Sequence, residues 1–521
     1  MALHDDLRRA ARDFPEQAAL EFEGATITYG ALHAQAQAVA AGLQGRGHRR
    51  GCAIAIMLPN CPEFIAIACG AFTAGHVATP LSVLLTPFEA RHILRDSAPE
   101  VLFVDAVLVP VIEAAMVDLD RTPDLVVLGG DAGAHTDFGA FLASCATATP
   151  LTIAPDDHLL TLYTSGTTGP AKGVMLSPAC LRAQVDMILG TFKPGPDTRI
   201  LCALPLFHAY ALNALVGTAF RTRATIVLHP RFDAAACARS LAQGGITWFA
   251  GVPTMYALLL EEGDRRPGLR FPDLDICLAG GAAMSSAVLS GFERRFGPAI
   301  LEGYGLTETT VSVASNAAAP DGRKPGSVGR PYAGIEARAI DKAGRTLPAG
   351  TTGELVFRGA NVMLGYLNRP DDTAQVLEDG WLRSGDLGHV DADGFCFIAG
   401  RLKDLIVKSG YNIVPSEVET AIRCAGLVRD AAVLGLPDPV RGERILAAVI
   451  LKDGADPALA RRQIDAAVKA RLSRYKHPSA VWFIDRFPLG PSGKILKPIL
   501  RDTWLATSDT RKDDVYAPVP A

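Results

Sequence analysis

The sequence lacks three features that would assign it to a class of protein at once. Its ten cysteines include no C-x-x-C pair, which argues against a zinc spacing and against a disulfide framework. It has no basic excess: the formal net charge is −4, so no nucleic-acid partner is expected, because binding a phosphate backbone needs clustered positive charge. It also has no long apolar run.

The best apolar stretch, residues 64–72, is interrupted by Gly70 and is far shorter than the roughly 20 residues that cross a bilayer. We therefore expect no transmembrane segment. The N-terminal residues MALHDDLRRAARDFPEQ mix acids with bases and have no apolar core, unlike a secretory signal, so a cytoplasmic location is the default expectation. The cysteines are expected to be mostly buried small apolar residues.

The remaining composition is typical of a globular protein with several domains. The 521 residues are 49% hydrophobic and 20% charged. Through the first 400 residues, short apolar runs alternate with Ala-rich stretches of helical period, which predicts an α/β fold of mostly parallel sheets covered by helices. Such runs are CAIAIML at 52–58, VLFV at 101–104 and ATIVL at 224–228.

The pattern changes twice further along the chain. Near Glu354, short strands with Gly and Asp turns predict a small β-rich region that ends the large domain. After Gly400 a βααβ-like pattern predicts a small α+β domain. We therefore place a large domain at 1–400, a small C-terminal domain at 401–507 and a frayed tail at 508–521.

A loop rich in glycine and hydroxyl groups follows an apolar run, with the sequence YTSGTTGPAKG from Tyr163 to Gly173. Glycines let the backbone wrap around an anion, and the hydroxyls and lysine add donors and positive charge, so the pattern indicates a phosphate-binding loop. The spacing of a Walker A loop is absent, and a plain polar turn is the alternative reading. The predicted phosphate-binding residues are Thr164, Ser165, Gly166, Thr167, Thr168, Gly169 and Lys172.

This loop resembles the signature of the adenylate-forming superfamily, which includes acyl-CoA synthetases, luciferases and peptide-synthetase adenylation domains. Further motifs follow in the family's order, and the resemblance covers the chain from Ala18 to Pro498. It implies an enzyme that activates a small-molecule carboxylic acid with ATP and Mg²⁺ as an acyl-adenylate. In the acyl-CoA synthetase branch, the acyl group then passes to coenzyme A.

The second motif is EGYGLTE at 302–308. The resemblance places the ring of Tyr304 on adenine, Thr307 on the α-phosphate and Glu308 on Mg²⁺. Residue chemistry agrees, because a flat ring suits a base and a carboxylate is a hard ligand for magnesium. Taken alone, G-Y-G would suit a turn. The resemblance adds to the adenylate pocket Glu302, Gly303, Gly305, Gly281 and Ala282.

Two later motifs concern the ribose and the hinge. SGD at 384–386 resembles the motif whose aspartate, Asp386, accepts hydrogen bonds from both ribose hydroxyls, although Asp386 could instead cap a turn. GRLKD at 400–404 resembles the hinge, where Arg401 contacts the nucleotide and a mobile small domain pivots near Lys403. A solvated charged turn is the alternative for these two cations.

GPSGK at 490–494 resembles the last motif, whose lysine enters the site during adenylation. A carboxylate that approaches the α-phosphate meets like charge, and at ~4 Å the repulsion is about 4 kcal/mol at an effective dielectric near 20. A cation between the two groups offsets this repulsion and stabilises the transition state. We therefore assign Lys494 a catalytic role beside Thr307, Glu308 and His208.

The identity of the acid rests on weaker cues. PLFHAYALN at 205–213 resembles the segment whose histidine lies beside the carboxyl end of the acyl group, and no acid that would pair a substrate ammonium is visible there. HAYALN is close to aryl-CoA ligases, whereas EGYGLTETT with RKPGSVGRP is closer to bacterial fatty-acyl ligases. The loop after Gly281 has no arginine, which argues against malonate. The expected acyl pocket consists of His208, Tyr210, Ala214, Gly280, Ala282, Met284, Thr309 and Val311.

Contacts with coenzyme A follow from the resemblance alone. Arg231 stands where coumarate-handling members carry a lysine and keeps the positive charge that a CoA phosphate would attract, whereas Val407 and Ser409 stand where lysine is common. The expected CoA-binding residues are Arg231, Lys403, Ser409, Gly410 and Tyr411.

The sequence therefore predicts an AMP-forming acid–CoA ligase for a medium- or long-chain fatty acid, with a hydroxycinnamate or benzoate as the alternative acid. A ligase that loads an acyl carrier protein would carry an insertion or a fused carrier motif, and neither is visible. A luciferase-like oxygenase shares every adenylate motif. A non-enzymatic nucleotide-binding scaffold would be expected to lose Lys494 or Glu308, and both are present. A homodimer is left open.

Overall fold

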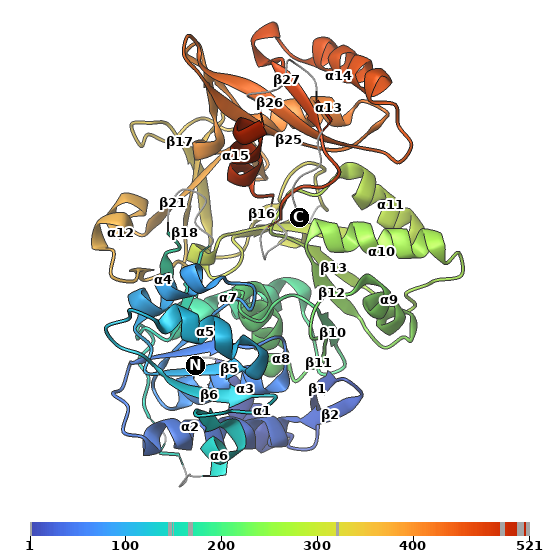
Figure 1. Ribbon diagram of the computed structural model, residues 1–521. Coiled ribbons are helices and arrows are strands. Elements are labelled where there is room, and N and C mark those ends of the chain that lie inside the picture. Colours follow the sequence, from blue (N-terminus) through green and yellow to red (C-terminus); the bar gives the residue numbers. More distant parts are fainter. Residues whose placement is uncertain are drawn as a thin grey trace. The chain divides into compact units, whose positions relative to one another are not determined.

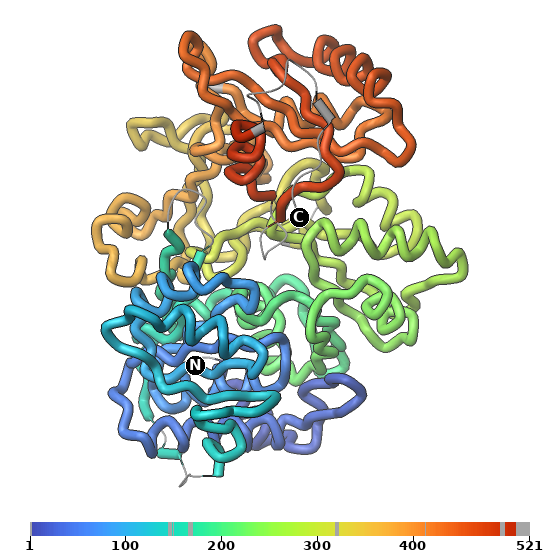
Figure 2. The backbone as a smooth tube through the Cα atoms, viewed as in Figure 1, coloured from blue at the N-terminus to red at the C-terminus, as the bar shows by residue number. Residues whose placement is uncertain are grey.

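The computed structural model of the chain divides into two compact units (Figures 1 and 2). The first unit consists of Met1–Glu336 and Phe357–Leu382, and the second of Ala337–Val356 and Arg383–Ala521. The residues that the structure describes are 3–143, 148–149, 151–164, 170–318, 322–489, 495–507 and 515–516.

Two large sheets form the centre of the first unit (Figure 1), and in both the parallel pairs outnumber the antiparallel ones. Apolar runs form their central strands, which are buried on both faces, as expected for parallel strands between helices. In order, the nine-stranded sheet is β16 (Arg330–Pro331), β15 (Ala314–Ser315), β14 (Ile300–Tyr304), β13 (Ile276–Ala279), β12 (Trp248–Gly251), β10 (Arg199–Cys202), β11 (Thr225–Leu228), β1 (Ala18–Phe22) and β2 (Ala25–Thr28). The eight-stranded sheet is β19 (Gly365–Tyr366), β9 (Gly173–Leu176), β8 (Leu160–Tyr163), β4 (Val77–Pro80), β3 (Ala53–Met57), β5 (Val101–Asp105), β6 (Asp124–Leu128) and β7 (Thr136–Asp137).

The apolar stretch at 64–72 forms helix α3 (Pro62–Thr73), which lies in the main core of this unit. Helix α2 (Tyr29–Gly45) packs so closely against it that a Cβ at Gly70 would lie 2.6 Å from Val39 Cγ1, which explains a glycine inside a helix. Of the helices in the described ranges, none has both the length and the apolarity to cross a membrane.

The other helices of the first unit differ in length and type. They are α1 (Leu3–Asp13), α4 (Pro87–Ser97), η1 (Ala106–Leu108), α5 (Val109–Met116), α6 (Phe138–Ala143), α7 (Pro178–Phe192), the π-helix η2 (Tyr210–Gly217), α8 (Thr218–Thr222), α9 (Ala234–Ala242), α10 (Pro253–Arg265), α11 (Ser286–Phe296), η3 (Thr307–Thr309), η4 (Asn316–Ala318) and α12 (Pro370–Val376).

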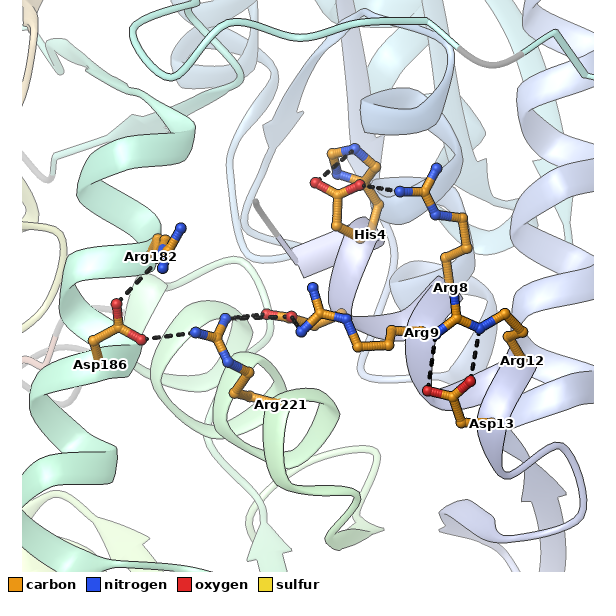
Figure 3. Close-up of polar contacts among 10 residues, drawn as sticks. His4, Arg8, Arg9, Arg12, Asp13, Arg182, Asp186 and Arg221 are labelled. Atoms are coloured by element: carbon orange, nitrogen blue, oxygen red, sulfur yellow. Dashed lines mark hydrogen bonds and ion pairs between the residues drawn. The ribbon is translucent and has the colours of Figure 1, made fainter.

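Helix α1 is held against α7 and α8 by a chain of ion pairs (Figure 3). Asp6 is buried, and its carboxylate lies 3.0 Å from Arg221 Nη1. The same guanidinium reaches Asp186 at 3.0 Å, and Arg182 contacts the other oxygen of Asp186 at 3.3 Å. One arginine therefore pairs with two carboxylates from different helices.

The second unit contains a six-stranded sheet, and the division between the units passes through a five-stranded one. The five-stranded sheet consists of β17 (Glu336–Ile340), β18 (Gly353–Arg358), β21 (Trp381–Val390), β20 (Leu377–Glu378) and β22 (Cys396–Arg401). The six-stranded sheet consists of β24 (Tyr411–Ile413), β23 (Ile406–Lys408), β26 (Gly442–Leu451), β27 (Ala480–Phe483), β28 (Val515–Tyr516) and β25 (Val428–Asp438). The helices are η5 (Leu402–Asp404), α13 (Pro415–Arg423), α14 (Pro457–Arg471), η6 (Arg474–Lys476) and α15 (Lys497–Thr507).

The predicted fold class is confirmed: parallel sheets with helical cover, a β-rich region and an α+β C-terminal part are all present. The two compact units divide after Glu336, Val356 and Leu382, and the domain boundary near Gly400 stays a prediction. The hinge at Lys403 stays a prediction. Most of the expected tail at 508–521 lies outside the described residues.

Most of the described cysteines are buried, and all of them are free thiols. Burial raises the pKa of Cys52 and of Cys202 to about 12, so these thiols stay protonated at neutral pH. Cys61 is half-buried, and Cys424, at the end of α13, is exposed.

Candidate active site

The predicted phosphate loop connects the antiparallel strands β8 and β9. Tyr163 pairs with Gly173, and Thr164 N donates to Lys172 O at 3.0 Å, so both ends of the loop are fixed. Helix α4 contributes further anchors, because Tyr163 donates its hydroxyl hydrogen to Asp96 at 2.8 Å. The intervening predicted residues, Ser165, Gly166, Thr167, Thr168 and Gly169, lie outside the described residues.

Lys172 lies at the end of this loop beside two side chains from the segment around α12. Its Nζ is 3.0 Å from Asp372 Oδ2 and 5.0 Å from the ring centroid of Tyr366. Both interactions are favourable to a cation. Strand β19 brings these partners to the loop by pairing with β9, in the register Tyr366↔Val174.

The predicted adenine and magnesium motif leads from the end of β14 into the 3₁₀ turn η3. Gly305 lies against the backbone that follows: a Cβ there would lie 2.0 Å from Val311 O. The ring of Tyr304 lies 5.7 Å from that of Phe357, with 41° between the planes. Thr307 and Glu308 begin η3 and are half-buried, so they remain open to a ligand.

Glu308 is held through both its backbone and its side chain. Met363 N donates to Glu308 O at 2.8 Å, and Tyr366 donates its hydroxyl hydrogen to Glu308 Oε1 at 2.8 Å. Because Lys172 also contacts the ring of Tyr366, the end of the loop and the predicted magnesium ligand meet at one tyrosine.

Asn361 holds the turn after Glu308. It is fully buried, and its Nδ2 donates to Thr309 O at 2.9 Å and to Ser312 O at 3.0 Å. Thr310 Oγ1 donates to Asn361 O at 2.7 Å. Thr309, a residue of the predicted acyl pocket, is completely buried, and its hydroxyl donates to Leu306 O.

The surroundings of Glu302, in the same motif, shift the pKa of its carboxyl group. Burial raises its pKa to about 7, against the opposing effects of Arg323 and the backbone amide of Met284. At neutral pH, therefore, a substantial fraction of this group is uncharged. Its backbone lies on β14, where Ser315 Oγ donates to Glu302 O at 3.3 Å.

Part of the predicted acyl pocket gathers at the start of the π-helix η2. Tyr210 begins this helix and donates its hydroxyl hydrogen to Leu278 O at 3.1 Å. A Cβ at Gly280 would lie 3.5 Å from Tyr210 Cε1 and 3.6 Å from Gly303 O, so these three predicted residues are neighbours. π-helical turns are rare and often occur at functional sites.

His208 lies in the turn before η2, where its N–H donates to Pro205 O at 3.1 Å and its ring lies 4.5 Å from that of Phe207. Asn60, two residues before α3, holds this turn in place. Its Nδ2 donates to Leu204 O at 2.9 Å, and its Oδ1 accepts from Leu206 N at 2.8 Å. The other predicted wall residues differ in exposure: Ala214 is buried, Met284 and Val311 are half-buried, and Ala282 is exposed, as is its neighbour Gly281 of the predicted adenylate pocket.

In the second unit, Asp386 and Arg401 lie side by side on the ladder between β21 and β22. Arg401 Nε is 3.3 Å from Asp386 Oδ1, and the Asp386 carboxylate is largely buried. Asp386 N donates to Ser384 Oγ at 3.0 Å, and Gly385 N donates to Glu354 Oε1 at 3.2 Å, which fixes the turn.

The residues predicted to bind CoA are exposed, and Lys403 lies in η5 and Tyr411 at the start of β24. In the first unit, Arg231 is exposed after β11. In the second, Lys403, Ser409 and Gly410 are exposed, and Tyr411 stacks on Tyr475 with ring centroids 4.8 Å apart. Lys494 lies outside the described residues. All of these ligand assignments remain predictions.

Three residues near the site were not predicted from the sequence: Asn361, Tyr366 and Asp372. They belong to the string NVMLGYLNRPDD, whose Gly-Tyr pair before a proline was the available signal. No local pattern shows that this string returns to β9, because that pairing joins residues almost 200 positions apart.

The described residues fit ATP and magnesium chemically. Glu308 has a hard carboxylate whose Oε1 accepts from Tyr366, and magnesium sites often use one or two carboxylates together with substrate phosphates. Lys172 provides a cation next to it, and Tyr304 a half-buried ring. The arrangement suits phosphoryl chemistry on a nucleotide.

Comparisons with known proteins agree with this reading. Residues 7–367 match the family described as AMP-binding enzyme, and residues 417–494 match its C-terminal domain. A sulfoacetate–CoA ligase from Cupriavidus necator is 36% identical over 483 residues, covering 91% of each chain. A long-chain-fatty-acid–CoA ligase from Bacillus subtilis is 33% identical over 529 residues, covering 95% of this chain and 93% of the relative.

Among solved structures, an anthranilate–CoA ligase in complex with anthranoyl-AMP superposes with a TM-score of 0.90 at 26% identity, covering 98% of both chains. Fold and site together define an acid–thiol ligase that works through an acyl-adenylate. The chain belongs to the AMP-binding enzyme family. It is an AMP-forming CoA ligase whose substrates are ATP, coenzyme A and a carboxylic acid, with Mg²⁺ as cofactor, as predicted.

Proposed function

We propose that the acid is a medium- or long-chain fatty acid. The observation that carries this proposal is the apolar character of the predicted acyl pocket. Tyr210 and Val311 pack against the main core, Ala214 is buried in it, and Met284 packs against the second core of the first unit. None of these side chains is charged, so an alkyl chain would be removed from water there without stranding an ion.

The proposed reaction has two steps. A carboxylate oxygen attacks the α-phosphorus of ATP, and the bond to pyrophosphate breaks. Thr164 to Lys172 and Thr307 hold the phosphates, Glu308 holds Mg²⁺, and Lys494 offsets the repulsion between the two anions. Bound Mg²⁺ neutralises phosphate charge. The CoA thiolate then attacks the acyl carbon, and AMP leaves with the electrons of the broken C–O bond.

One observation favours the alternative, an aryl acid. Gln184 on α7 is completely buried, and its Oε1 accepts from Ser312 N at 3.0 Å, next to the predicted wall residue Val311. Its Nε2 has no hydrogen-bond partner in the described part of the chain. An oxygen on an aromatic ring would give this amide an acceptor, which an alkyl chain would not.

The acid is tested by measuring pyrophosphate release with octanoate, palmitate, ferulate, benzoate, sulfoacetate and malonate, each with and without CoA. We expect pyrophosphate release with the two fatty acids. When CoA is present, we also expect mass spectrometry to detect their CoA thioesters. Release confined to ferulate or benzoate would favour the aryl alternative. Adenylation without any thioester would instead indicate transfer to a carrier protein. A cytoplasmic location and a homodimer stay predictions.

A further inference from the structure

Tyr366 connects two predicted motifs of the first unit: its backbone lies on β19, which pairs with β9 at the end of the phosphate loop, and its side chain reaches Glu308. Leu364 N donates to Met175 O at 2.9 Å and Leu367 N donates to Gly173 O at 2.8 Å, so the strand is fixed beside the end of the phosphate loop. Tyr366 N donates to Thr373 Oγ1 at 2.9 Å. The tyrosine therefore has little freedom to move.

Its side chain extends from this fixed backbone to Glu308. The residue is 8% exposed, and its hydroxyl is 2.8 Å from Glu308 Oε1. Met363, three residues earlier on the same segment, donates its N–H to Glu308 O at 2.8 Å. One short segment thus holds both ends of the glutamate.

A carboxylate on two rotatable side-chain bonds beyond Cβ would otherwise sample several orientations toward a metal ion. A hydroxyl that donates to one oxygen fixes the plane of the carboxylate and leaves the other oxygen for coordination. Partners of this kind orient metal ligands in many sites, and their loss typically costs about 10–100-fold in metal affinity or activity.

We infer that Tyr366 is a positioning residue that orients the Glu308 carboxylate toward Mg²⁺ and keeps it in register with Lys172. The inference rests on the proposed function through its assignment of Glu308 to magnesium. Lys172 supports it independently, because its Nζ lies 5.0 Å from the centroid of the same ring. Tyr366 acts through Glu308 and does not touch the reacting atoms.

The test replaces Tyr366 by phenylalanine, which keeps the ring under Lys172 and removes only the hydroxyl. We expect Tyr366→Phe to raise the free Mg²⁺ concentration for half-maximal pyrophosphate release by about 10–100-fold. The second measurement needs no turnover: the thermal shift caused by α,β-methylene-ATP, with and without MgCl₂. The Mg²⁺-dependent part of this shift should shrink in Tyr366→Phe, while the part seen without Mg²⁺ should persist.

Tyr29→Phe is the matched control for losing a buried tyrosine hydroxyl. Tyr29 lies in the same unit and donates to the backbone oxygens of Ala219 at 2.9 Å and Ala224 at 2.7 Å, away from both motifs. We expect this control to lower the unfolding temperature without changing the Mg²⁺ requirement. An equal change in the Mg²⁺ requirement of both variants would overturn the inference.

A double-mutant cycle with Glu308→Gln separates positioning through Glu308 from any other effect. If Tyr366 acts through Glu308, the double variant should need no more Mg²⁺ than Glu308→Gln alone. Additive effects, or a wild-type Mg²⁺ requirement in Tyr366→Phe, would overturn the inference. The thermal-shift measurement uses nucleotide and metal alone, so it still reports on Tyr366 if every acid in the panel fails.

Discussion

Gly305 shows how a single residue can determine the position of a whole motif. An added Cβ there would overlap Val311 O at 2.0 Å and Ser312 Cα at 2.4 Å, and both are backbone atoms that cannot rotate away. The close approach brings the end of β14 against the turn after Glu308. The glycine is therefore required by packing between two backbone segments.

We expect Gly305→Ala to lower stability by about 1–3 kcal/mol and to reduce adenylation strongly, because overpacking would push the turn away. Gly190→Ala on α7 is the control, since an added Cβ there would have nothing within 4 Å. Thermal unfolding and single-turnover pyrophosphate release measure the two effects. Similar losses in both variants would contradict this explanation.

Glu302 should make stability depend on pH. Burial raises its folded pKa to about 7, above its value in the unfolded chain, so its stabilising contribution is full at low pH and is lost as the pH rises toward 7. We expect Glu302→Gln to stabilise the protein at about pH 8, by on the order of 1–3 kcal/mol, and to have little effect near pH 4.

Glu293 provides a control of opposite sign for the Glu302 experiment. Burial alone would raise the pKa of Glu293, but the ion pair with Arg323 and the hydrogen bond from the amide of Ile300 lower this pKa overall. The contribution of Glu293 to the free energy of unfolding is therefore present above its pKa in the unfolded chain and is lost on acidification. Unfolding temperatures measured across pH for both glutamine variants should diverge, and parallel curves would refute the assignment.

At the scale of elements, the docking of α1 depends on Arg221, because it pairs with Asp6 and Asp186 together (Figure 3). Removing it leaves the buried Asp6 carboxylate without its main counter-charge. We expect Arg221→Ala to cost about 2–4 kcal/mol, since breaking a buried pair leaves an uncompensated charge.

Arg182→Ala is the matched control for Arg221→Ala, because Arg182 pairs with Asp186 at an exposed position. Exposed pairs contribute about 0–1 kcal/mol, so this variant should unfold near the wild-type midpoint. The urea midpoint of the first unit, followed by fluorescence, provides the measurement. If Arg182→Ala lowers the urea midpoint as much as Arg221→Ala does, burial of the ion pair does not explain the effect of Arg221→Ala.

Elements with a strong local pattern could be predicted from the sequence, and elements defined by distant pairing could not. The runs at 52–58 and 224–228 contain β3 and β11, and the run at 101–104 is all of β5 but its last residue, because short continuous apolar runs favour buried strands. The π-helix η2 follows a pattern that an α-helix would also satisfy. Strand β19 is two residues long, and only its pairing with β9 defines it.

The same distinction separates the site residues. Tyr304, Thr307 and Glu308 belong to one contiguous motif, so composition and resemblance were sufficient to propose them. Tyr366 and Asn361 reach that motif only through the folded chain. Their roles follow from hydrogen bonds that no spacing rule in the sequence encodes.

At the scale of the whole molecule, the two half-reactions should be separable. Lys494 is proposed to serve adenylation only, because the repulsion between the carboxylate and the α-phosphate exists only in that step. We expect Lys494→Ala to lose pyrophosphate release by 10²-fold or more, roughly the effect of removing one electrostatic contact to a transition state. Thioester formation from supplied acyl-AMP should persist.

Lys497 provides the comparison for Lys494→Ala. It is three residues away and is engaged with Glu419 at 2.8 Å and with Val433 O at 2.9 Å, within the second unit. Lys497→Ala should therefore affect the stability of that unit more than either half-reaction. Loss of both half-reactions in Lys494→Ala would show that the lysine has another role.

The contrast between Cys424 and the buried thiols offers a way to follow the second unit. A maleimide dye added to the native protein would react first at this exposed cysteine, because the buried thiols are shielded from the reagent. Cys145 lies outside the described residues, and Cys145→Ser would keep the labelling single. The emission of one fluorophore could then report in real time whether the C-terminal part reorients between ATP consumption and thioester release.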